Sequence, residues 1–233
     1  MSTDKENSSL SAKVIYDLTS FTHLDYPDHL SCIVWFSGCN MRCDYCYNKD
    51  IVFAKDGKYS YNDILDFLKT RVNLLEAVVI SGGEASSYEL APFCSKIKEL
   101  GFKIKLDTNG TNFVHIKELI ELNLLDYVAL DYKAPVAKFT QITHSNKFDE
   151  FSKTLDYLIK SNIKFEARTT LHAELLDAND INTIMADLQE RGYKSPFYIQ
   201  EFLDTGVNIA GLSAPKSKFD RTLLHDTLEV IFR

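Results

Sequence analysis

The sequence alternates short β-rich apolar runs with longer stretches of helical periodicity from residue 31 onward. This alternation is typical of repeated βα units around a parallel sheet. The expected strands are Cys32–Phe36, Ala77–Ser81, Lys103–Asp107, Tyr127–Asp131, Phe165–Thr170 and Phe197–Phe202. Apolar residues spaced three and four apart predict helices over Tyr61–Val72, Tyr88–Leu100, Val114–Leu122, Phe148–Lys160, Asp180–Arg191 and Lys218–Phe232. Six such units are too few for a closed eightfold barrel, so a partial (βα)6 barrel and an open doubly wound sheet both fit.

The composition bounds the class of protein. With 233 residues, 45% of them apolar, we expect a single domain over residues 14–233 behind a flexible N-terminal tail, residues 1–13. The net charge of −7 argues against nucleic acid or an anionic membrane as a partner. The polar start of the chain does not resemble a secretory signal, and no later run is apolar for long enough to predict a membrane span, so we expect a cytoplasmic protein.

Three of the five cysteines, Cys39, Cys43 and Cys46, lie in one short loop after the first expected strand. Thiolates at spacings of four and three residues can converge on one metal centre, and soft sulfur ligands select iron-sulfur or zinc chemistry. Three ligands leave one iron of a cubane cluster open, whereas a structural zinc ion needs a fourth protein ligand. His23, His29 or Cys94 is a candidate for that ligand, so both metals remain open on the loop alone.

Polar residues follow the next two expected strands. Gly82, Gly83 and Glu84 come directly after the second strand, where paired glycines let the backbone approach a ligand and a carboxylate can accept hydrogen bonds from an ammonium group. The segment from Asp107 to Asn109 ends the third strand in the same way. Because parallel α/β folds bind ligands at the carboxyl ends of their strands, these residues predict a binding site.

Charged residues also end the fourth and fifth expected strands. Asp131 and Lys133 are two residues apart in an extended segment and therefore point to the same side, where they offer an acceptor and a cation to a zwitterion. Arg168 can bind a carboxylate through both arms of its guanidinium group. Structural ion pairs at the rim of the barrel are the alternative for all three side chains.

The cysteine loop, with Tyr45 before its third cysteine, resembles the CxxxCx(aromatic)C signature of the radical S-adenosylmethionine (SAM) superfamily. The resemblance implies a partial TIM-like barrel with a 4Fe-4S cluster on Cys39, Cys43 and Cys46. It also implies that SAM chelates the unique iron, that reduction cleaves SAM to methionine and a 5′-deoxyadenosyl radical, and that Tyr45 lies against the adenine. The remaining SAM contacts that it implies are Gly82, Gly83, Glu84, Asp107, Asn109, Asp131, Lys133 and Arg168.

The segments DTNG and DYKAP, beginning at Asp107 and Asp131, resemble the activating enzymes of glycyl-radical enzymes. Within that class the chain is most similar to the activating protein of anaerobic ribonucleoside-triphosphate reductase, in its opening from Thr19 to Pro27, the strand into Cys39, and the segments DYKAP and RTT. This resemblance implies a glycyl-radical enzyme subunit as protein partner and a flavodoxin or ferredoxin as electron donor. Some members also bind a monovalent cation at two aspartates, and Asp107 and Asp131 match those positions. Another radical SAM reaction on a small molecule, or a non-catalytic zinc-binding interaction module, are the alternative functions.

Overall fold

The structure is a computed structural model that describes residues 11–233, and its chain divides into two compact units. The described part of unit 1 comprises residues 11–40, 50–108 and 112–128, and unit 2 comprises residues 41–49, 109–111 and 129–233. Most of the predicted tail, residues 1–10, lies outside the described residues. The single domain over residues 14–233 stays a prediction.

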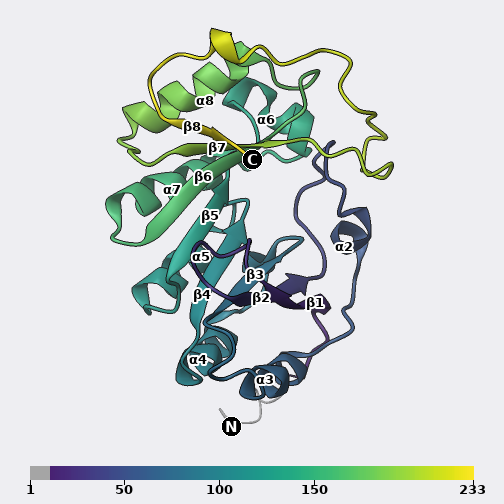
Figure 1. The fold of residues 1–233 in the computed structure, drawn as a ribbon, viewed down its shortest axis with the longest axis vertical. Helices are drawn as coiled ribbons and strands as arrows, with labels where there is room; N and C mark the ends of the chain where they lie inside the picture. Colours follow the sequence, from purple (N-terminus) through teal and green to yellow (C-terminus); the bar gives the residue numbers. More distant parts are fainter. Residues whose placement is uncertain (1–10) are drawn as a thin grey trace. The chain divides into compact units, whose positions relative to one another are not determined.

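Unit 1 is built around three parallel strands and one antiparallel strand at their edge (Figure 1). Strand β1 pairs antiparallel with β2, and β2, β3 and β4 follow in parallel register. The sequence did not predict β1, whose alternating polar residues suit an edge strand. The elements are β1 (Ile15–Thr22), β2 (Ser31–Phe36), α2 (Lys49–Phe53, whose first residue belongs to unit 2), α3 (Tyr61–Lys69), β3 (Ala77–Gly82), the 3-10 turn η1 (Ala85–Ser87), α4 (Ala91–Glu99), β4 (Lys103–Thr108) and α5 (Phe113–Glu121).

The two faces of the β2–β4 sheet differ in character. On one face, the register aligns Val34, Ile80 and Leu106, all fully buried. Helices α3 and α4 supply a stacked aromatic pair, Tyr61 and Phe93, whose ring centroids are 4.5 Å apart. The other face aligns Ile33, Val79 and Lys105, which places a lysine where burial favours an apolar residue.

Unit 2 carries the remaining strands, of which β6, β7 and β8 pair in parallel (Figure 1). Strand β5 (Tyr127–Asp131) crosses from unit 1 into unit 2 after Val128. The other elements are α6 (Val136–Thr143), α7 (Phe148–Lys160), β6 (Lys164–Leu171), α8 (Ala178–Glu190), β7 (Phe197–Glu201), the 3-10 turn η2 (Arg221–Leu223) and β8 (Val230–Phe232). In both units the strand order is the order of the sequence. Among the described residues, no helix has the length and apolarity needed to cross a bilayer.

The predicted helix over Lys218–Phe232 is wrong. The structure has the short turn η2 and then strand β8, in which Ile231 pairs with Tyr198 of β7. The β-branched residues at the end of this segment favour a strand, and the open edge of β7 offers the hydrogen bonds that a strand needs. Beyond β8, Arg233 forms an ion pair with buried Glu166 of β6, with Nη2 2.6 Å from Oε1.

Substitution Arg233→Ala tests this C-terminal strand. Loss of the ion pair removes a cation from a buried carboxylate, so we expect a loss of unfolding free energy of about 1–2 kcal/mol. The matched control is Arg221→Ala, because Arg221 also contacts β8, stacking on Phe232, but its ion pair with Glu201 is exposed. Urea unfolding should show the larger loss for Arg233→Ala, and equal losses would contradict the role given to Glu166.

Candidate functional site

The beginning of the cysteine loop is held by the main chain of the loop after β3, all within unit 1. The amide of Gly83 donates to the carbonyl of Phe36 at 2.9 Å, and the amide of Glu84 donates to that of Gly38 at 2.9 Å. A Cβ atom on Gly83 would lie 1.7 Å from the carbonyl oxygen of Gly38. The glycines therefore permit close approach of two backbones next to Cys39, in addition to any approach to a ligand.

The rest of the cysteine loop lies in unit 2, where two distant segments hold it. The amides of Arg42 and Asp44 donate to the carbonyls of Thr143 and Ile142 at the end of α6, at 2.9 and 3.0 Å. From residues 209 and 210, two further amides donate to the carbonyls of Cys46 and Asp44, each at 3.1 Å. These bonds give an irregular loop a defined shape, because buried backbone groups need partners.

Glu84 is buried and collects hydrogen-bond donors within unit 1. Its Oε1 accepts from the amide and hydroxyl of Ser86, at 3.2 and 2.6 Å, and from the hydroxyl of Thr108 at 2.7 Å. Glu84 thus caps η1 and fixes the end of β4 as well as carrying a carboxylate. The sequence predicted Glu84 but did not single out Ser86 or Thr108, because short hydroxyl residues at the ends of strands and in turns are common.

Asp131, Lys133 and Arg168 form one ion-pair network in unit 2. The carboxylate of Asp131 accepts from Lys133 Nζ at 2.8 Å through one oxygen and from Arg168 Nε through the other. Burial alone would raise the pKa of Asp131, but the two cations hold it well below its usual range. Burial alone would lower the pKa of Lys133, but Asp131 and its other neighbours keep it well above its usual range. Arg168 Nη1 also lies 3.9 Å from Oε1 of Glu166, which pairs with Arg233, so the extended network has three cations and two anions and favours an anionic group as ligand.

Tyr45 places an unsatisfied polar atom beside this network. Its ring lies with Lys133 Nζ 5.9 Å from the centroid, and its hydroxyl is buried with no hydrogen-bond partner in the described residues. Burial raises the pKa of Tyr45 well above its usual range, so the hydroxyl keeps its proton. Burial also raises the pKa of the Cys43 thiol to about 11, against the opposing charge of Lys133, so metal binding must displace that proton.

Asp107 and Asn109 have partners that the sequence did not identify. In unit 1, Asp107 accepts from the buried Lys105 at 2.7 Å and from the hydroxyl of Ser81 at 3.1 Å. In unit 2, the side-chain oxygen of Asn109 accepts from the amide and hydroxyl of Thr111, which shapes the turn after β4. The sequence did allow Lys105 to be identified as a neighbour of Asp107. Lys105 lies two residues before Asp107, and residues two apart in a strand point to the same face.

The other cysteines and the buried histidine have structural surroundings. Cys32 and Cys94 are fully buried, and burial raises the pKa of each thiol to about 12, as expected of small apolar side chains. His172 accepts from the amide of Glu174 at Nδ1, so its Nε2 carries the proton and donates to the carbonyl of Ser213 at 3.0 Å. Both of its nitrogens are therefore satisfied by the loops around it.

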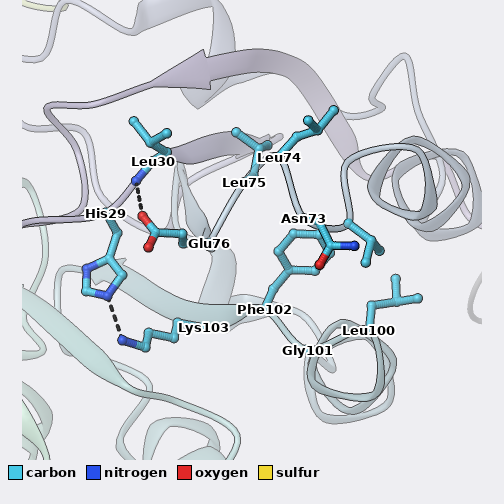
Figure 2. A pocket seen from close by; sticks show the side chains of 11 residues that line it. His29, Leu30, Asn73, Leu74, Leu75, Glu76, Leu100, Gly101, Phe102 and Lys103 are labelled. Carbon is cyan, nitrogen blue, oxygen red and sulfur yellow. Dashed lines mark hydrogen bonds between the residues drawn. The ribbon is translucent and has the colours of Figure 1, made fainter.

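A pocket of about 520 Å³ in unit 1 is lined by residues at the amino ends of the strands, among them Leu30, Glu76 and Lys103 (Figure 2). Glu76, which precedes β3, accepts from the amide of Leu30 at 2.9 Å, and Lys103 Nζ lies 2.6 Å from Nε2 of His29. Of the residues that the sequence singled out, the alternative zinc ligand His29 lines this pocket, but none of the predicted cluster or SAM ligands does. Within unit 1, we therefore assign the candidate site residues to the opposite, carboxyl ends of the strands.

The residues present fit an iron-sulfur cluster and SAM. Cys39 lies in unit 1 and Cys43 and Cys46 in unit 2, and in residues 11–233 no three side chains of the His, Cys, Asp and Glu types are grouped as a metal site. The fit rests on the chemistry of the donors: three soft thiols in one short loop, a buried tyrosine hydroxyl without a partner, and a net cationic trio.

Comparison with known proteins agrees with this chemistry. Residues 33–185 match the family model described as the radical SAM superfamily. A protein of Methanocaldococcus jannaschii, named as a glycyl-radical enzyme activating enzyme, is 34% identical over 188 residues that cover 76% of each chain. The pyruvate formate-lyase 1-activating enzyme of Escherichia coli K12 is 33% identical over 147 residues, 57% of each chain.

Solved structures show the same fold. SuiB of Streptococcus suis, bound to its precursor peptide SuiA, gives a TM-score of 0.64 at 15% identity, over 85% of this chain and 48% of that one. The structure described as native anSMEcpe with bound AdoMet gives a TM-score of 0.60 at 21% identity, over 72% of this chain and 50% of that one. This chain spans about half the length of these two structures.

The chain belongs to the radical SAM superfamily and is therefore an enzyme that uses a 4Fe-4S cluster and SAM. Its named relatives include glycyl-radical enzyme activating enzymes. The predicted α/β fold with a parallel sheet, the partial TIM-like barrel of this superfamily, is confirmed. Membership in this family argues against the alternative function, a non-catalytic zinc-binding module.

Substitution Gly83→Ala tests the anchoring of the cysteine loop. The added methyl group would overlap the carbonyl of Gly38, so we expect a loss of roughly 3 kcal/mol of unfolding free energy and poor iron loading. The matched control is Gly101→Ala, where φ is +89° but no atom lies within 4 Å of the added carbon, at a cost of about 1 kcal/mol. Equal losses in urea unfolding would contradict the role given to the close approach of Gly83 and Gly38.

Substitution Asp131→Asn tests the ion-pair network. It leaves Lys133 and Arg168 as neighbouring cations without the carboxylate between them, so we expect the free energy of unfolding to fall by roughly 3 kcal/mol. Because the folded-state pKa of Asp131 is depressed, its stabilisation is complete above the unfolded-state pKa of about 3.9 and is lost as the pH falls through the lower folded-state pKa. The free energy of unfolding, measured with urea at a series of acidic pH values, should therefore change more steeply with pH in the wild type than in Asp131→Asn.

The control for this series is Asp17→Asn, which removes an exposed aspartate-lysine pair with Lys58. Its stability should remain close to that of the wild type at neutral pH, because exposed pairs contribute little. An Asp131→Asn variant that is as stable as this control would contradict the network.

Proposed function

We propose that this enzyme generates a glycyl radical on a partner protein, with anaerobic ribonucleoside-triphosphate reductase as the first partner to test. The observation that carries the proposal is the three-thiol loop, held by main-chain bonds beside a buried tyrosine hydroxyl that has no partner in the described residues. The archaeal relative, similar over 76% of both chains, is named for this class of activity. The choice of reductase is supported by the resemblance of the opening from Thr19 to Pro27 and of the segments that begin at Asp131 and Arg168.

The chain's own residues would position the cofactors. Cys39, Cys43 and Cys46 would hold the cluster, and Glu84 and Tyr45 would bind polar groups of SAM. The chemistry that the bound cofactors supply is the reductive cleavage of SAM to methionine and a 5′-deoxyadenosyl radical, which abstracts a Cα hydrogen atom from a glycine of the partner. The protein contributes orientation and exclusion of water.

The net cationic trio supports binding of a carboxylate. Arg168 is already oriented by Asp131, and its side chain is 12% exposed, so it offers charge without first becoming ordered. Lys133 is 17% exposed and keeps its proton, as its raised pKa requires. We infer that the SAM carboxylate binds to these three side chains. The alternative is that they form ion pairs with a purely structural role.

The remaining partners follow from the chemistry. An electron must enter for each SAM cleaved, so we propose a flavodoxin or ferredoxin as the donor, and the oxygen sensitivity of an open iron favours a reducing cytoplasm. A second candidate function is modification of a small molecule, since a Synechocystis protein named GTP 3',8-cyclase is 30% identical over 149 residues, 60% of this chain and 44% of that protein.

The decisive pair of variants is Cys43→Ala and Cys94→Ala. Cys43 is a proposed cluster ligand, whereas Cys94 is fully buried in α4. After anaerobic reconstitution, iron and sulfide analysis should show near-complete loss of the cluster in Cys43→Ala and normal loading in Cys94→Ala. The loaded wild type, incubated with SAM, reductant and the reductase subunit, should give a glycyl doublet by electron paramagnetic resonance.

The outcomes separate the two functions. SAM cleavage without a glycyl doublet on the reductase or on other glycyl-radical enzymes would favour the small-molecule reaction. Zinc without acid-labile sulfide in the anaerobically purified protein would contradict both.

A further inference from the structure

We propose that Lys105 is a built-in cation of the site, a positioning residue that holds Asp107 in place of a bound monovalent metal ion. The proposal deepens the proposed function, since it takes Asp107 as part of the SAM site. It rests on the contacts of Lys105, Asp107 and Ser81, all within unit 1.

The geometry is that of a closed charge pair. Lys105 Nζ lies 2.7 Å from Oδ1 of Asp107, and the hydroxyl of Ser81 donates to Oδ2 at 3.1 Å. The side chain of Lys105 is 3% exposed and that of Asp107 is 14% exposed. Both oxygens of the carboxylate therefore have a donor from the protein, and one donor carries a full charge.

A lysine in this position is costly unless it has a function. Its register partner on β3 is Val79, which belongs to an apolar cluster with Ile33 and Tyr26. Burial of an ammonium group among such residues is tolerated only when a counter-charge is present. The counter-charge here is Asp107, an aspartate that the sequence assigns to the binding site.

The contacts of Asp107 continue toward the loop that holds Cys39. Ser81 precedes Gly82 and Gly83, whose backbone packs against Phe36 and Gly38. A fixed ammonium group at Lys105 thus sets the position of the carboxylate, and the carboxylate sets the end of β3. A metal ion bridging to the same carboxylate would do this equally well, but the lysine occupies that role permanently.

The test is cation dependence of Lys105→Met, measured as thermal unfolding of the cluster-loaded protein in choline, sodium and potassium chloride at equal ionic strength. We expect the wild type to unfold at one temperature in all three salts. Lys105→Met should unfold roughly 10 °C lower in choline, because the carboxylate loses its cation, and should regain most of that loss in sodium or potassium. SAM affinity, measured in the same salts, should fall and recover in parallel.

The matched control is Lys103→Met, since Lys103 lies on the same strand but is exposed beside His29. The unfolding temperature of Lys103→Met should be the same in all three salts. A wild type that gains stability from sodium or potassium, or a Lys105→Met variant lowered equally in all salts, would overturn the proposal.

The double variant Lys105→Met/Asp107→Asn covers the case in which the single variant does not fold. With both charges removed, the double variant should fold, unfold at a higher temperature than the single variant, and have the same unfolding temperature in all three salts. A double variant that is as unstable as the single variant would overturn the proposal. These melts need neither reductant nor protein partner. Absence of a glycyl doublet would therefore leave the inference standing while it removed the proposed partner.

Discussion

The structure depends on how an irregular loop of three cysteines is held without regular secondary structure of its own. Its start is fixed by the loop after β3, where only glycine at position 83 lets two backbones meet. The remainder is fixed by the end of α6 and by residues 209 and 210. Because buried amides and carbonyls must be paired, residues distant in the chain determine the shape of the loop that carries the three cysteines.

Buried charge pairs at the ends of neighbouring strands are the second constraint. Each unit carries a lysine and an aspartate two residues apart, Lys105 with Asp107 in unit 1 and Lys133 with Asp131 in unit 2. In an extended chain this spacing puts both side chains on one face, so the pair forms locally. In unit 2 the network extends from Asp131 through Arg168 to Glu166 and Arg233, so three cations face two carboxylates, which suits an anionic ligand.

Much of this arrangement could be predicted from the sequence, and the exceptions have physical causes. Apolar runs separated by amphipathic stretches were sufficient for β2 to β7. The cysteine spacing left iron-sulfur and zinc both open, and the resemblance to the radical SAM signature chose the cluster that the family match supports. Strand β8 was predicted as a helix because a short run of apolar residues fits the helical period as well as the strand period. Pairing with β7 decides in favour of the strand. Lys105 escaped notice because its burial depends on neighbouring strands, and a charged residue in a strand otherwise indicates an exposed position.

The central claim is that Cys39, Cys43 and Cys46 bind three irons of the cluster and leave the fourth to SAM. Hyperfine spectroscopy of the reduced cluster, with isotopic labels in the amino and carboxylate groups of SAM, measures this directly. The account predicts that both labels couple to the cluster spin. A reduced cluster that binds SAM tightly but shows no coupling to either label would contradict it.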